Sequence, residues 1–402
     1  MTTTTNNEQK KLNVPNLRFP EFQGEWKKCI LGDITENFNL RNKDKIQYPM
    51  FSVTNDRGFV PQSEQFEGRD MVGEDIKAYK IIHTNDFAYN PARINVGSIA
   101  IYTGEKPCMI SSLYVCFKTT KEVNNEWLMQ LLKTPKMNYY YNVNGEGGVR
   151  VYLFYPNFAR IRMSIPNIEE QKKIAKLLNL IDERIATQNK IIDKLQTLIK
   201  GIMVELQKQG VNKGTWKKVF LSDVLTERNE RNTNLFQVFS VSVSQGVVNQ
   251  VDYLGRSFAA KDTSKYNVVH YGDLVYTKSP TGSFPYGIVK QSLNLENVAV
   301  SPLYGVYKPK SLAVGAYLHE YFMSEINTHN YLHPLIQKGA KNTINITNQR
   351  FLENCVLLPT NINELLQISK LLRSLNNKIK YQQDILQQYQ KQKQYLLRQM
   401  FI

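Results

Sequence analysis

Residues 166–206 decide the fold and read PNIEEQKKIAKLLNLIDERIATQNKIIDKLQTLIKGIMVEL. Their apolar residues recur at alternating spacings of four and three, and a 3.5-residue repeat held this long is typical of a coiled-coil seam. Residues 359–400 repeat the pattern, and each stretch begins with a proline and carries a glutamine at the same step. The predicted seam, which also serves partner binding, comprises Ile174, Leu178, Ile181, Ile185, Gln188, Ile192, Leu195 and Ile199, with Ile368, Leu372, Leu375, Ile379, Gln382 and Leu386.

We expect the two helices to pair antiparallel, because a two-fold relation between them would bring Gln188 and Gln382 together near the middle of the seam. In the alternative, both helices are merely amphipathic and cover globular domains. A covering helix more usually shows the wider stripe of a 3.6-residue period, and it need not be this long.

The chain is a tandem repeat. Within 17 positions, seven residues recur with a displacement of 190, and later matches keep the same order. This argues for an internal duplication. The seven are Trp26, Lys27, Lys28, Leu31, Asp33, Arg41 and Asn42, answered by Trp216, Lys217, Lys218, Leu221, Asp223, Arg231 and Asn232.

Each copy begins with a globular part, in which short β-branched and aromatic runs alternate with Gly, Asn and Pro. This pattern is typical of strands joined by loops, and a helix is expected near 126–141 and near 314–332. The fold class is therefore mixed α/β. We predict a disordered segment over 1–14, globular domains over 15–165 and 210–358, and long helices over 166–209 and 359–402.

The composition indicates which partners the chain binds, but it does not indicate a catalytic activity. A net charge of +16 over 402 residues favours a polyanion such as DNA. No apolar run approaches 18 residues and the first residues lack a secretory pattern, so we expect a cytoplasmic protein without membrane contact. The four cysteines form no C-x-x-C pair, which argues against a disulfide framework and a zinc knuckle.

Catalytic motifs are missing. The chain contains no P-loop, no G-x-G-x-x-G, no H-E-x-x-H and no G-x-S-x-G. His329 and His333 have the spacing of two metal ligands, but without a third ligand a solvated helix face is favoured, and we expect no metal. His83 and His270 each precede an aspartate by three residues, where proton transfer competes with the favoured hydrogen bond at a strand end.

Two loops in each copy carry groups suited to DNA. Glycine lets the backbone approach a phosphate, arginine can bond guanine, and asparagine can bond adenine. The loops occupy matching places but differ in sequence, which favours the reading of two different short sequences; alternatively they are simple turns. The candidates are Arg41, Asn90, Arg93, Asn95, Gly145, Gly147, Gly148, Arg150 and Tyr152 in copy one, and Arg231, Lys278, Thr281, Ser283, Lys338, Lys341, Asn342, Thr343 and Asn345 in copy two.

The whole arrangement resembles the specificity subunit of a type I restriction-modification system. The resemblance rests on VPNLRFPEF at 14–22, followed by Trp26 and Leu31, and on PNIEEQKKI at 166–174. Copy two lacks the R-F-P sequence and has Leu365 where copy one has Gln171.

The resemblance implies that each globular part is a target-recognition domain for double-stranded DNA and that the helices are an antiparallel spacer. Two modification subunits, which bind S-adenosylmethionine and methylate adenine, would dock on the helices. Restriction subunits would use ATP and Mg to translocate and cut. This chain would then hold no cofactor and no catalytic residue. From Ile174 to Leu206 the first helix covers 32 steps, about 48 Å, or about 14 base pairs.

Two alternatives stay open from the residues. One is a stand-alone sequence-specific DNA-binding protein, and the other is a DNA-modifying enzyme with an unrecognised site. Neither the bases read nor the residues that read them follow from the sequence, because side-chain preferences are no code without the loop geometry.

Overall fold

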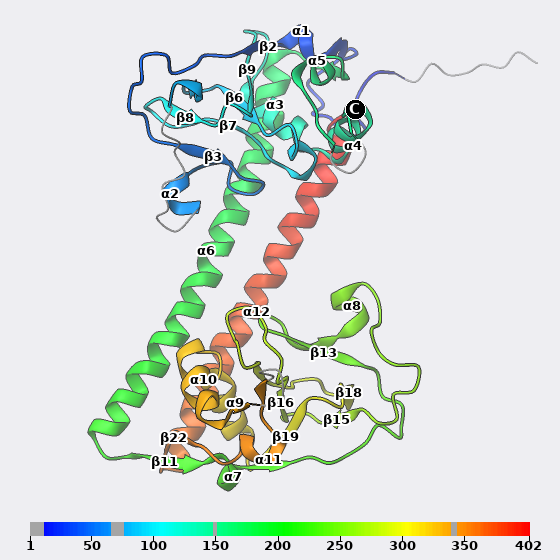
Figure 1. Cartoon of the computed structure of the whole chain (residues 1–402). Coiled ribbons are helices and arrows are strands. Elements are labelled where there is room, and N and C mark those ends of the chain that lie inside the picture. Colours follow the sequence, from blue (N-terminus) through cyan, green and yellow to red (C-terminus); the bar gives the residue numbers. More distant parts are fainter. Residues whose placement is uncertain (1–11, 66–75, 148–150, 339–343) are drawn as a thin grey trace, which may run out of the picture. The chain divides into compact units, whose positions relative to one another are not determined.

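The computed structural model describes residues 12–65, 76–147, 151–338 and 344–402. The chain divides into two compact units (Figure 1). Unit 1 contains the chain up to Thr187 together with Leu386–Ile402, and unit 2 is Gln188–Ile385. The boundary therefore cuts both long helices, α6 (Ile168–Asn212) and α12 (Ile362–Gln399). Each unit holds one globular domain and a part of each long helix.

In unit 1, a four-stranded antiparallel sheet has the order β2-β9-β6-β7. Three further strand pairs, β1–β10, β3–β4 and β5–β8, are also antiparallel. The elements are β1 (Lys27–Ile30), α1 (Leu31–Ile34), β2 (Thr35–Phe38), β3 (Phe51–Val53), β4 (Phe59–Pro61), α2 (Gln62–Gln65), η1 (Ile76–Ala78), β5 (Lys80–Ile82), β6 (Phe87–Tyr89), η2 (Ile94–Val96), β7 (Ile99–Ile101), β8 (Cys108–Ile110), β9 (Val115–Thr119), α3 (Asn125–Leu132), α4 (Pro135–Asn144), α5 (Tyr155–Ala159) and β10 (Arg162–Ile165).

Unit 2 repeats this frame. Its four-stranded sheet has the order β12-β19-β16-β17, and β11 pairs with β22 as β1 pairs with β10. The elements are β11 (Trp216–Phe220), α7 (Leu221–Val224), β12 (Leu225–Glu227), β13 (Phe239–Ser242), β14 (Gly246–Asn249), α8 (Gln250–Leu254), β15 (Asn267–Val269), β16 (Leu274–Tyr276), β17 (Val289–Gln291), β18 (Val298–Val300), β19 (Gly305–Pro309), α9 (Leu312–Tyr321), α10 (Glu325–Leu332), η3 (His333–Leu335), β20 (Gln337–Lys338), β21 (Ile344–Asn345), α11 (Asn348–Phe351) and β22 (Cys355–Pro359). The predicted mixed α/β fold with an internal repeat is confirmed.

The helices that cover each sheet begin at capping residues. The side chain of Asn124 accepts a hydrogen bond from the backbone N–H of Trp127 at the start of α3, and Thr134 caps α4, whose first residue is Pro135. Ser311 and Ser324 cap α9 and α10 in the same way. Such caps satisfy N–H groups that have no partner within the helix, which fixes where each helix starts.

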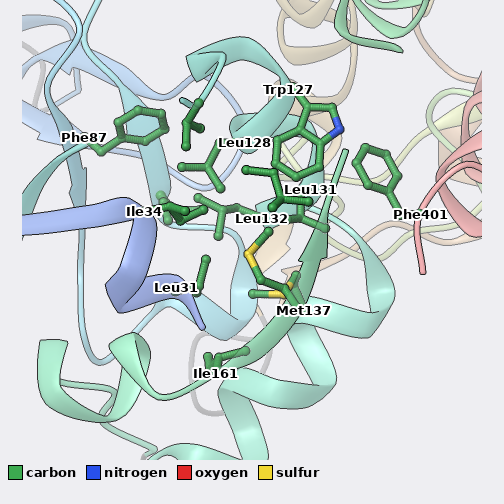
Figure 2. Close-up of a cluster of buried hydrophobic side chains, with 14 of the residues drawn as sticks. Leu31, Ile34, Phe87, Trp127, Leu128, Leu131, Leu132, Met137, Ile161 and Phe401 are labelled. Carbon is green, nitrogen blue, oxygen red and sulfur yellow. The ribbon is translucent and has the colours of Figure 1, made fainter. Parts of the chain in front are cut away.

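The core of unit 1 is shared between the globular domain and both long helices. Trp127 is fully buried, and the ring of Phe401, beyond the end of α12, packs against it at 5.9 Å (Figure 2). Leu178 from α6 and Met400 next to α12 belong to the same cluster. Burial of apolar surface therefore joins the domain and the helix pair into one unit.

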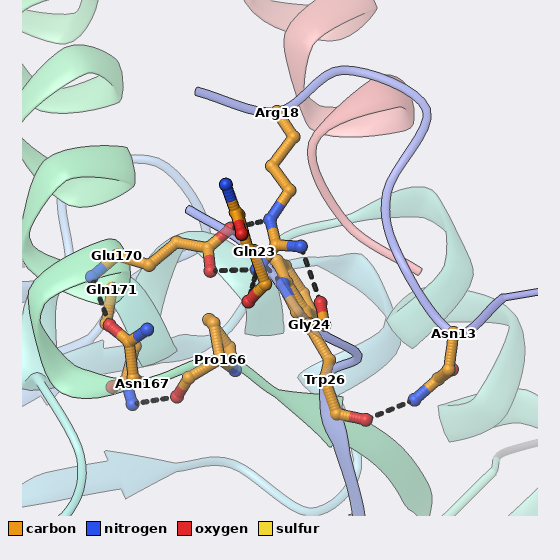
Figure 3. A network of polar contacts seen from close by, with 9 residues as sticks. All are labelled: Asn13, Arg18, Gln23, Gly24, Trp26, Pro166, Asn167, Glu170 and Gln171. Atoms are coloured by element: carbon orange, nitrogen blue, oxygen red, sulfur yellow. Dashed lines mark hydrogen bonds and ion pairs between the residues drawn. The ribbon is translucent and has the colours of Figure 1, made fainter. Parts of the chain in front are cut away.

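A polar network ties the beginning of α6 to the preceding chain (Figure 3). Arg18 donates from Nε and Nη2 to the two carboxylate oxygens of Glu170 at 2.8 Å each, and Trp26 Nε1 donates to Oε1 at 3.2 Å. Asn13, which we assigned to the disordered segment, instead donates to the carbonyl oxygen of Trp26 at 2.5 Å and accepts from its N–H at 2.8 Å. The backbone of Trp26, immediately before β1, is what holds Asn13 in place.

The second copy keeps part of this network. Trp216 Nε1 donates to Glu364 Oε1 at 2.7 Å, which repeats the bond of Trp26 to Glu170. Gln171 is 1% exposed and donates to the carbonyl oxygens of Pro166 and Glu122. Leu365, which replaces Gln171 in copy two, is also buried. At this position, the hydrogen bonds that hold the start of the long helix in copy one are thus replaced by apolar burial in copy two.

The long helices pair antiparallel, as predicted. In unit 1, Lys393 of α12 contacts Asp182 of α6, and Tyr389, one turn earlier on α12, accepts a hydrogen bond from Arg184, which lies later on α6. In unit 2, Gln188 Nε2 donates to the carbonyl oxygen of Gln382 at 3.1 Å. Buried seam positions are Ile174, Leu178, Ile181, Gln188, Ile192, Ile199, Ile368, Leu372 and Ile379, and half-buried ones are Ile185, Leu195, Leu375, Gln382 and Leu386.

Neither long helix resembles a membrane span. Within the described ranges, we find no helix that is both long enough and apolar enough to cross a bilayer.

Candidate nucleic-acid interface

The first predicted loop of unit 1 is a tight turn that follows β6. Asn90 Oδ1 accepts from the N–H of Ala92 at 3.0 Å, and the carbonyl oxygen of Asn90 accepts from the N–H of Arg93 at 3.0 Å. Ile94 is 3% exposed and anchors the turn, while Arg93 is exposed. Because its guanidinium has solvent on its outer side and a fixed backbone behind it, Arg93 is available to an anion.

The second loop of unit 1 begins at the end of α4. Glu146 and Tyr152 exchange two backbone hydrogen bonds of 2.8 Å, and Gly147 has φ +106°, a left-handed conformation that favours glycine. The ring of Tyr152 stacks on Phe154 at 6.2 Å with an interplanar angle of 12°, and both side chains are exposed. Gly148 and Arg150 lie outside the described residues.

These two loops lie together. The N–H of Leu153 donates to the carbonyl oxygen of Pro91 at 3.0 Å, which joins one loop to the other. Asn95 Nδ2 also donates to Asn142 Oδ1 on α4 at 3.0 Å. Although the loops are about fifty residues apart in the chain, they form one surface that includes Arg93, Asn95 and Tyr152. Gly145, at the end of α4, opens the second loop at this surface.

In unit 2, the first predicted loop is fastened to α10. Thr281 and Phe284 exchange two backbone hydrogen bonds of 3.0 Å, and the ring of Phe284 is 4% exposed. Ser283 Oγ donates to Glu325 Oε1, in the first turn of α10, at 2.5 Å. Lys278 has φ +59° and is half-buried; burial lowers the pKa of its ammonium, partly offset by Glu227. This lysine is thus less available to an anion than Arg93.

Three rings join this loop to the next one. Tyr286 packs against His329 at 5.3 Å and against His333 at 6.0 Å, and the two imidazoles stack at 5.2 Å with an angle of 16°. Both histidines are exposed. His333 begins η3, which leads into β20, so the cluster connects the loop around Thr281 with the stem of the second loop. Sequence reasoning missed Tyr286 and Phe154, for which only their position beside the loops was a signal.

The second predicted loop of unit 2 lies between β20 and β21. Its stem pairs β20 with β21 antiparallel, with Gln337 opposite Asn345 and Lys338 opposite Ile344. The side chains of Lys338 and Asn345 are not described, and Lys341, Asn342 and Thr343 lie outside the described residues.

Arg41 and Arg231 begin another turn that both copies share. Asn42 closes it by accepting from the N–H of Ile46 at 3.0 Å, and Asn232 does the same with Phe236 at 2.7 Å. Arg41 is exposed, whereas Arg231 Nη1 donates to Asn267 Oδ1 at 2.5 Å. The guanidinium of Arg231 therefore already has a partner inside its own domain.

The histidine–aspartate motif of each copy lies at a strand end. Asp86 Oδ2 accepts from the backbone N–H of His83 at 2.8 Å, and Asp273 Oδ2 accepts from that of His270 at the same distance. Asp273 also accepts two bonds from Arg228, at 2.6 and 3.1 Å. Burial raises the pKa of Asp86, an effect that the His83 bond and Lys118 partly offset. The aspartate holds the turn through the main chain, which supports the strand-end interpretation over proton transfer.

Metal ligands do not gather around His329 and His333. Within the part of the chain that the structure describes, no group of three or more His, Cys, Asp or Glu side chains could hold a metal ion.

The comparisons with known proteins agree with this geometry. A family model described as "Type I restriction modification DNA specificity domain" matches residues 23–197. The first copy is similar to this family of specificity domains. The matched region runs from just before β1 into α6, and it includes both loops that meet around Arg93.

Two curated relatives from Methanocaldococcus jannaschii are specificity subunits by name. The "Putative type I restriction enzyme MjaX specificity subunit" is 26% identical over 212 residues, which is 50% of this chain and 50% of that protein. The "Type I restriction enzyme MjaVIII specificity subunit" is 30% identical over 131 residues, or 33% of this chain and 30% of that protein. The chain thus spans about half the length, or less, of the curated relatives that it matches.

Solved structures extend the likeness to the second copy. The S subunit of a type I restriction-modification system from M. genitalium matches with a TM-score of 0.59 and 10% identity, over 97% of this chain and 99% of that one. A chain from a structure on the assembly and conformational transition of the type I system matches with 0.50 and 12%, over 92% and 96%. At these identities the likeness concerns the fold, and it shows that both copies have the fold of a specificity subunit.

Proposed function

We propose that this chain is the DNA-recognition subunit of a type I restriction-modification complex and that its two globular domains read a bipartite site in double-stranded DNA. One observation carries the proposal: a single frame is used twice, and each copy gathers different loops on one surface. The shared sheet order, the Trp–Glu bond and the asparagine turn make up the frame. Two equal frames with different loops suit two different DNA sequences.

The chemistry of the loops supports DNA as the ligand. In unit 1 the exposed guanidinium of Arg93 and the amide of Asn95 lie beside a glycine turn, where a phosphate or a base edge can approach. The stacked pair Tyr152 and Phe154 offers an exposed aromatic face. With a net charge of +16, release of counterions from DNA favours binding.

The long helices offer surfaces for partner subunits. Along them, apolar side chains remain between about two fifths and two thirds exposed, and exposed apolar surface of this kind marks interaction sites. We propose two modification subunits and further restriction subunits as the partners. The exposed side chains include Leu180, Leu198 and Val204 on α6 and Leu371 and Tyr381 on α12.

Specificity subunits of this family are generally non-catalytic. The proposed division of labour assigns S-adenosylmethionine to the modification subunits and ATP with Mg to the restriction subunits. This chain would hold none of these cofactors and no catalytic residue, and it would act in the cytoplasm, where the DNA is.

The decisive experiment is to coexpress the chain with an adenine methyltransferase subunit and to map methylated adenines across a genome. We expect a motif of two short blocks around a fixed gap. Exchanging residues 90–97 for the loop of another specificity subunit should change one block and leave the gap and the other block intact. A continuous motif, or a change in both blocks, would contradict the proposal.

Two variants that each remove one positive charge provide a matched comparison. Arg93→Gln should weaken DNA binding or relax the block that unit 1 reads. Arg160→Gln removes the same charge from an exposed site at the end of α5, outside both loops, and should have little effect. Equal losses in the two variants would show that only overall charge matters.

A further inference from the structure

In unit 1, a neutral side chain of the globular domain meets a charged side chain of a long helix. Gln130 on α3 is 7% exposed and donates from Nε2 to Asp182 Oδ2 and to Asn179 Oδ1 on α6, at 2.9 Å each. Asp182 also accepts from Lys393 Nζ on α12, at 2.5 and 2.7 Å. At this contact the domain contributes the amide of Gln130, with Lys133 nearby, and the two helices contribute an anion and a cation.

In unit 2, the equivalent contact has the opposite polarity. Glu320 on α9 follows Gln130 by 190 positions, the same displacement as that between the two tryptophans. Asn376 on α12 follows Asp182 by 194 positions, the displacement that relates Glu170 to Glu364. Asn376 Nδ2 donates to Glu320 Oε1 at 2.5 Å. Here the domain contributes the carboxylate, and the helix contributes the amide.

The balancing cation has moved as well. The residue 194 positions before Lys393 is Ile199, which is apolar and 5% exposed. Unit 2 instead carries Lys290 on β17 of its domain, 3% exposed and donating to the carbonyl oxygen of Val243 at 2.5 Å. Burial raises the pKa of Glu320, while the Asn376 hydrogen bond and Lys290 lower it. In unit 1, the carboxylate that meets the buried amide of the domain therefore lies on α6, although the domain also contributes Lys133 near Asp182 and the exposed Glu126, which accepts from Asn179. In unit 2, the carboxylate and the lysine both lie in the globular domain.

We propose that this reversed polarity is a docking code, which decides which globular domain each pair of helix segments accepts. The surface around Asp182 and Lys393 takes a domain with a neutral amide at the position of Gln130. The surface around Asn376 and Ile199 accepts either kind of domain: one with a neutral amide, or one that brings its own carboxylate and lysine. The code is independent of the DNA that either domain reads.

The code is asymmetric. The unit 2 domain placed on the unit 1 helices would bring Glu320 against Asp182, and two carboxylates at hydrogen-bonding distance cannot both stay ionised without a large penalty. The unit 1 domain placed on the unit 2 helices would bring Gln130 against Asn376, and two amides can bond each other. Duplication of the first domain is therefore tolerated, and duplication of the second is rejected.

The test is a compensation experiment on the full chain. Gln130→Glu should lower the unfolding temperature by at least about 5 °C, and adding Asp182→Asn, which recreates the polarity of unit 2, should recover at least half of the loss. The mirror variants are Asn376→Asp and Asn376→Asp with Glu320→Gln. Asp193→Asn, which neutralises an exposed carboxylate on α6, is the control for charge alone.

Two outcomes would overturn the proposal: Gln130→Glu as stable as the unaltered chain, or a loss that Asp182→Asn does not reduce. If Gln130→Glu yields no folded protein, recovery of folded protein by the double variant becomes the measurement. A chain in which residues 210–358 also replace residues 15–165 should aggregate unless Asp182 is changed to Asn. The converse chain, with the first domain twice, should fold without that change.

Discussion

Gln188 on α6 donates its side-chain N–H both to the main-chain carbonyl oxygen of Gln382 on α12, at 3.1 Å, and to the side-chain oxygen of the same residue. Gln188 is only 7% exposed, in a seam that is otherwise mainly apolar. A buried polar pair satisfies itself only when the two helices are in one register. The pair therefore trades stability for a defined alignment.

Replacing both glutamines with leucine should raise the free energy of unfolding by about 1–2 kcal/mol and loosen the register. The first effect is measured by denaturant unfolding. The second is measured with cysteine pairs placed across the seam, either in register or one heptad out of register. If stability and cross-linking are both unchanged, the pair has no role in alignment.

The Arg18–Glu170 pair should matter more than its counterpart in copy two. Glu170 is 1% exposed on its side chain and accepts from Arg18 and Trp26, whereas Glu364 accepts from Trp216. We expect Glu170→Gln to cost about 2–3 kcal/mol of unfolding free energy, because it leaves a guanidinium without its counter-charge, and Glu364→Gln to cost about 1 kcal/mol. Equal costs in chemical denaturation would refute the ranking.

Acid should destabilise unit 2 through His319. Burial, and then the charge of Lys290, lower the pKa of its imidazole to about 3, and Nδ1 accepts from the N–H of Gln291 at 3.0 Å. Lys290 and Glu320 are the charged groups beside it. Because the folded pKa lies below the unfolded value of 6.5, its stabilising effect is complete above pH 6.5 and is lost progressively as the pH falls towards 3.

Between pH 7.5 and 5.5, the free energy of unfolding should fall by about 1 kcal/mol. This is somewhat below the full effect of about 1.4 kcal/mol per pH unit, because part of the imidazole ring remains exposed. His319→Gln keeps an acceptor for Gln291 but cannot take up the proton, so its stability should depend less on pH. Urea unfolding of both proteins at the two pH values gives the difference. Identical pH profiles would contradict the assignment.

The length of the helices should set the gap between the two DNA blocks. Deleting residues 184–190 together with 380–386 removes one heptad from each helix and leaves Asp182, Asn376 and Lys393 in place. Seven residues span about 10 Å, so the unread gap should shorten by about three base pairs. Mapping of methylated adenines measures the gap directly, and a gap of unchanged length would rule out the ruler.

Local patterns in the sequence predict much of the fold. The spacing of Ile174, Leu178 and Ile181 predicts a helix face because helical periodicity depends only on neighbouring residues. The repeat of Trp26 as Trp216 predicts a second domain of the same design for a similar reason: equal sequences make equal local contacts.

The candidate site could be predicted only in part, because partners that are distant in the chain decide it. Arg231 and Arg93 are both basic residues near a turn. The guanidinium of Arg231 donates a hydrogen bond to Asn267, whereas Arg93 is exposed and, among the described residues, free for a ligand. The packing of Tyr286 on His329 joins residues more than forty positions apart. No local pattern encodes such a contact, since it depends on how loops fold back onto α10.

The composition of unit 1 also affects the order of events on the ribosome. Its core needs Leu396, Leu397 and Met400 in addition to the first domain. All of residues 188–385 are translated in between, which takes roughly 10–40 s at about 5–20 residues per second. Unit 2 is continuous in sequence and is synthesised during that wait. The domain that is made first is therefore completed last, and until then its uncovered apolar face is a natural client for a chaperone.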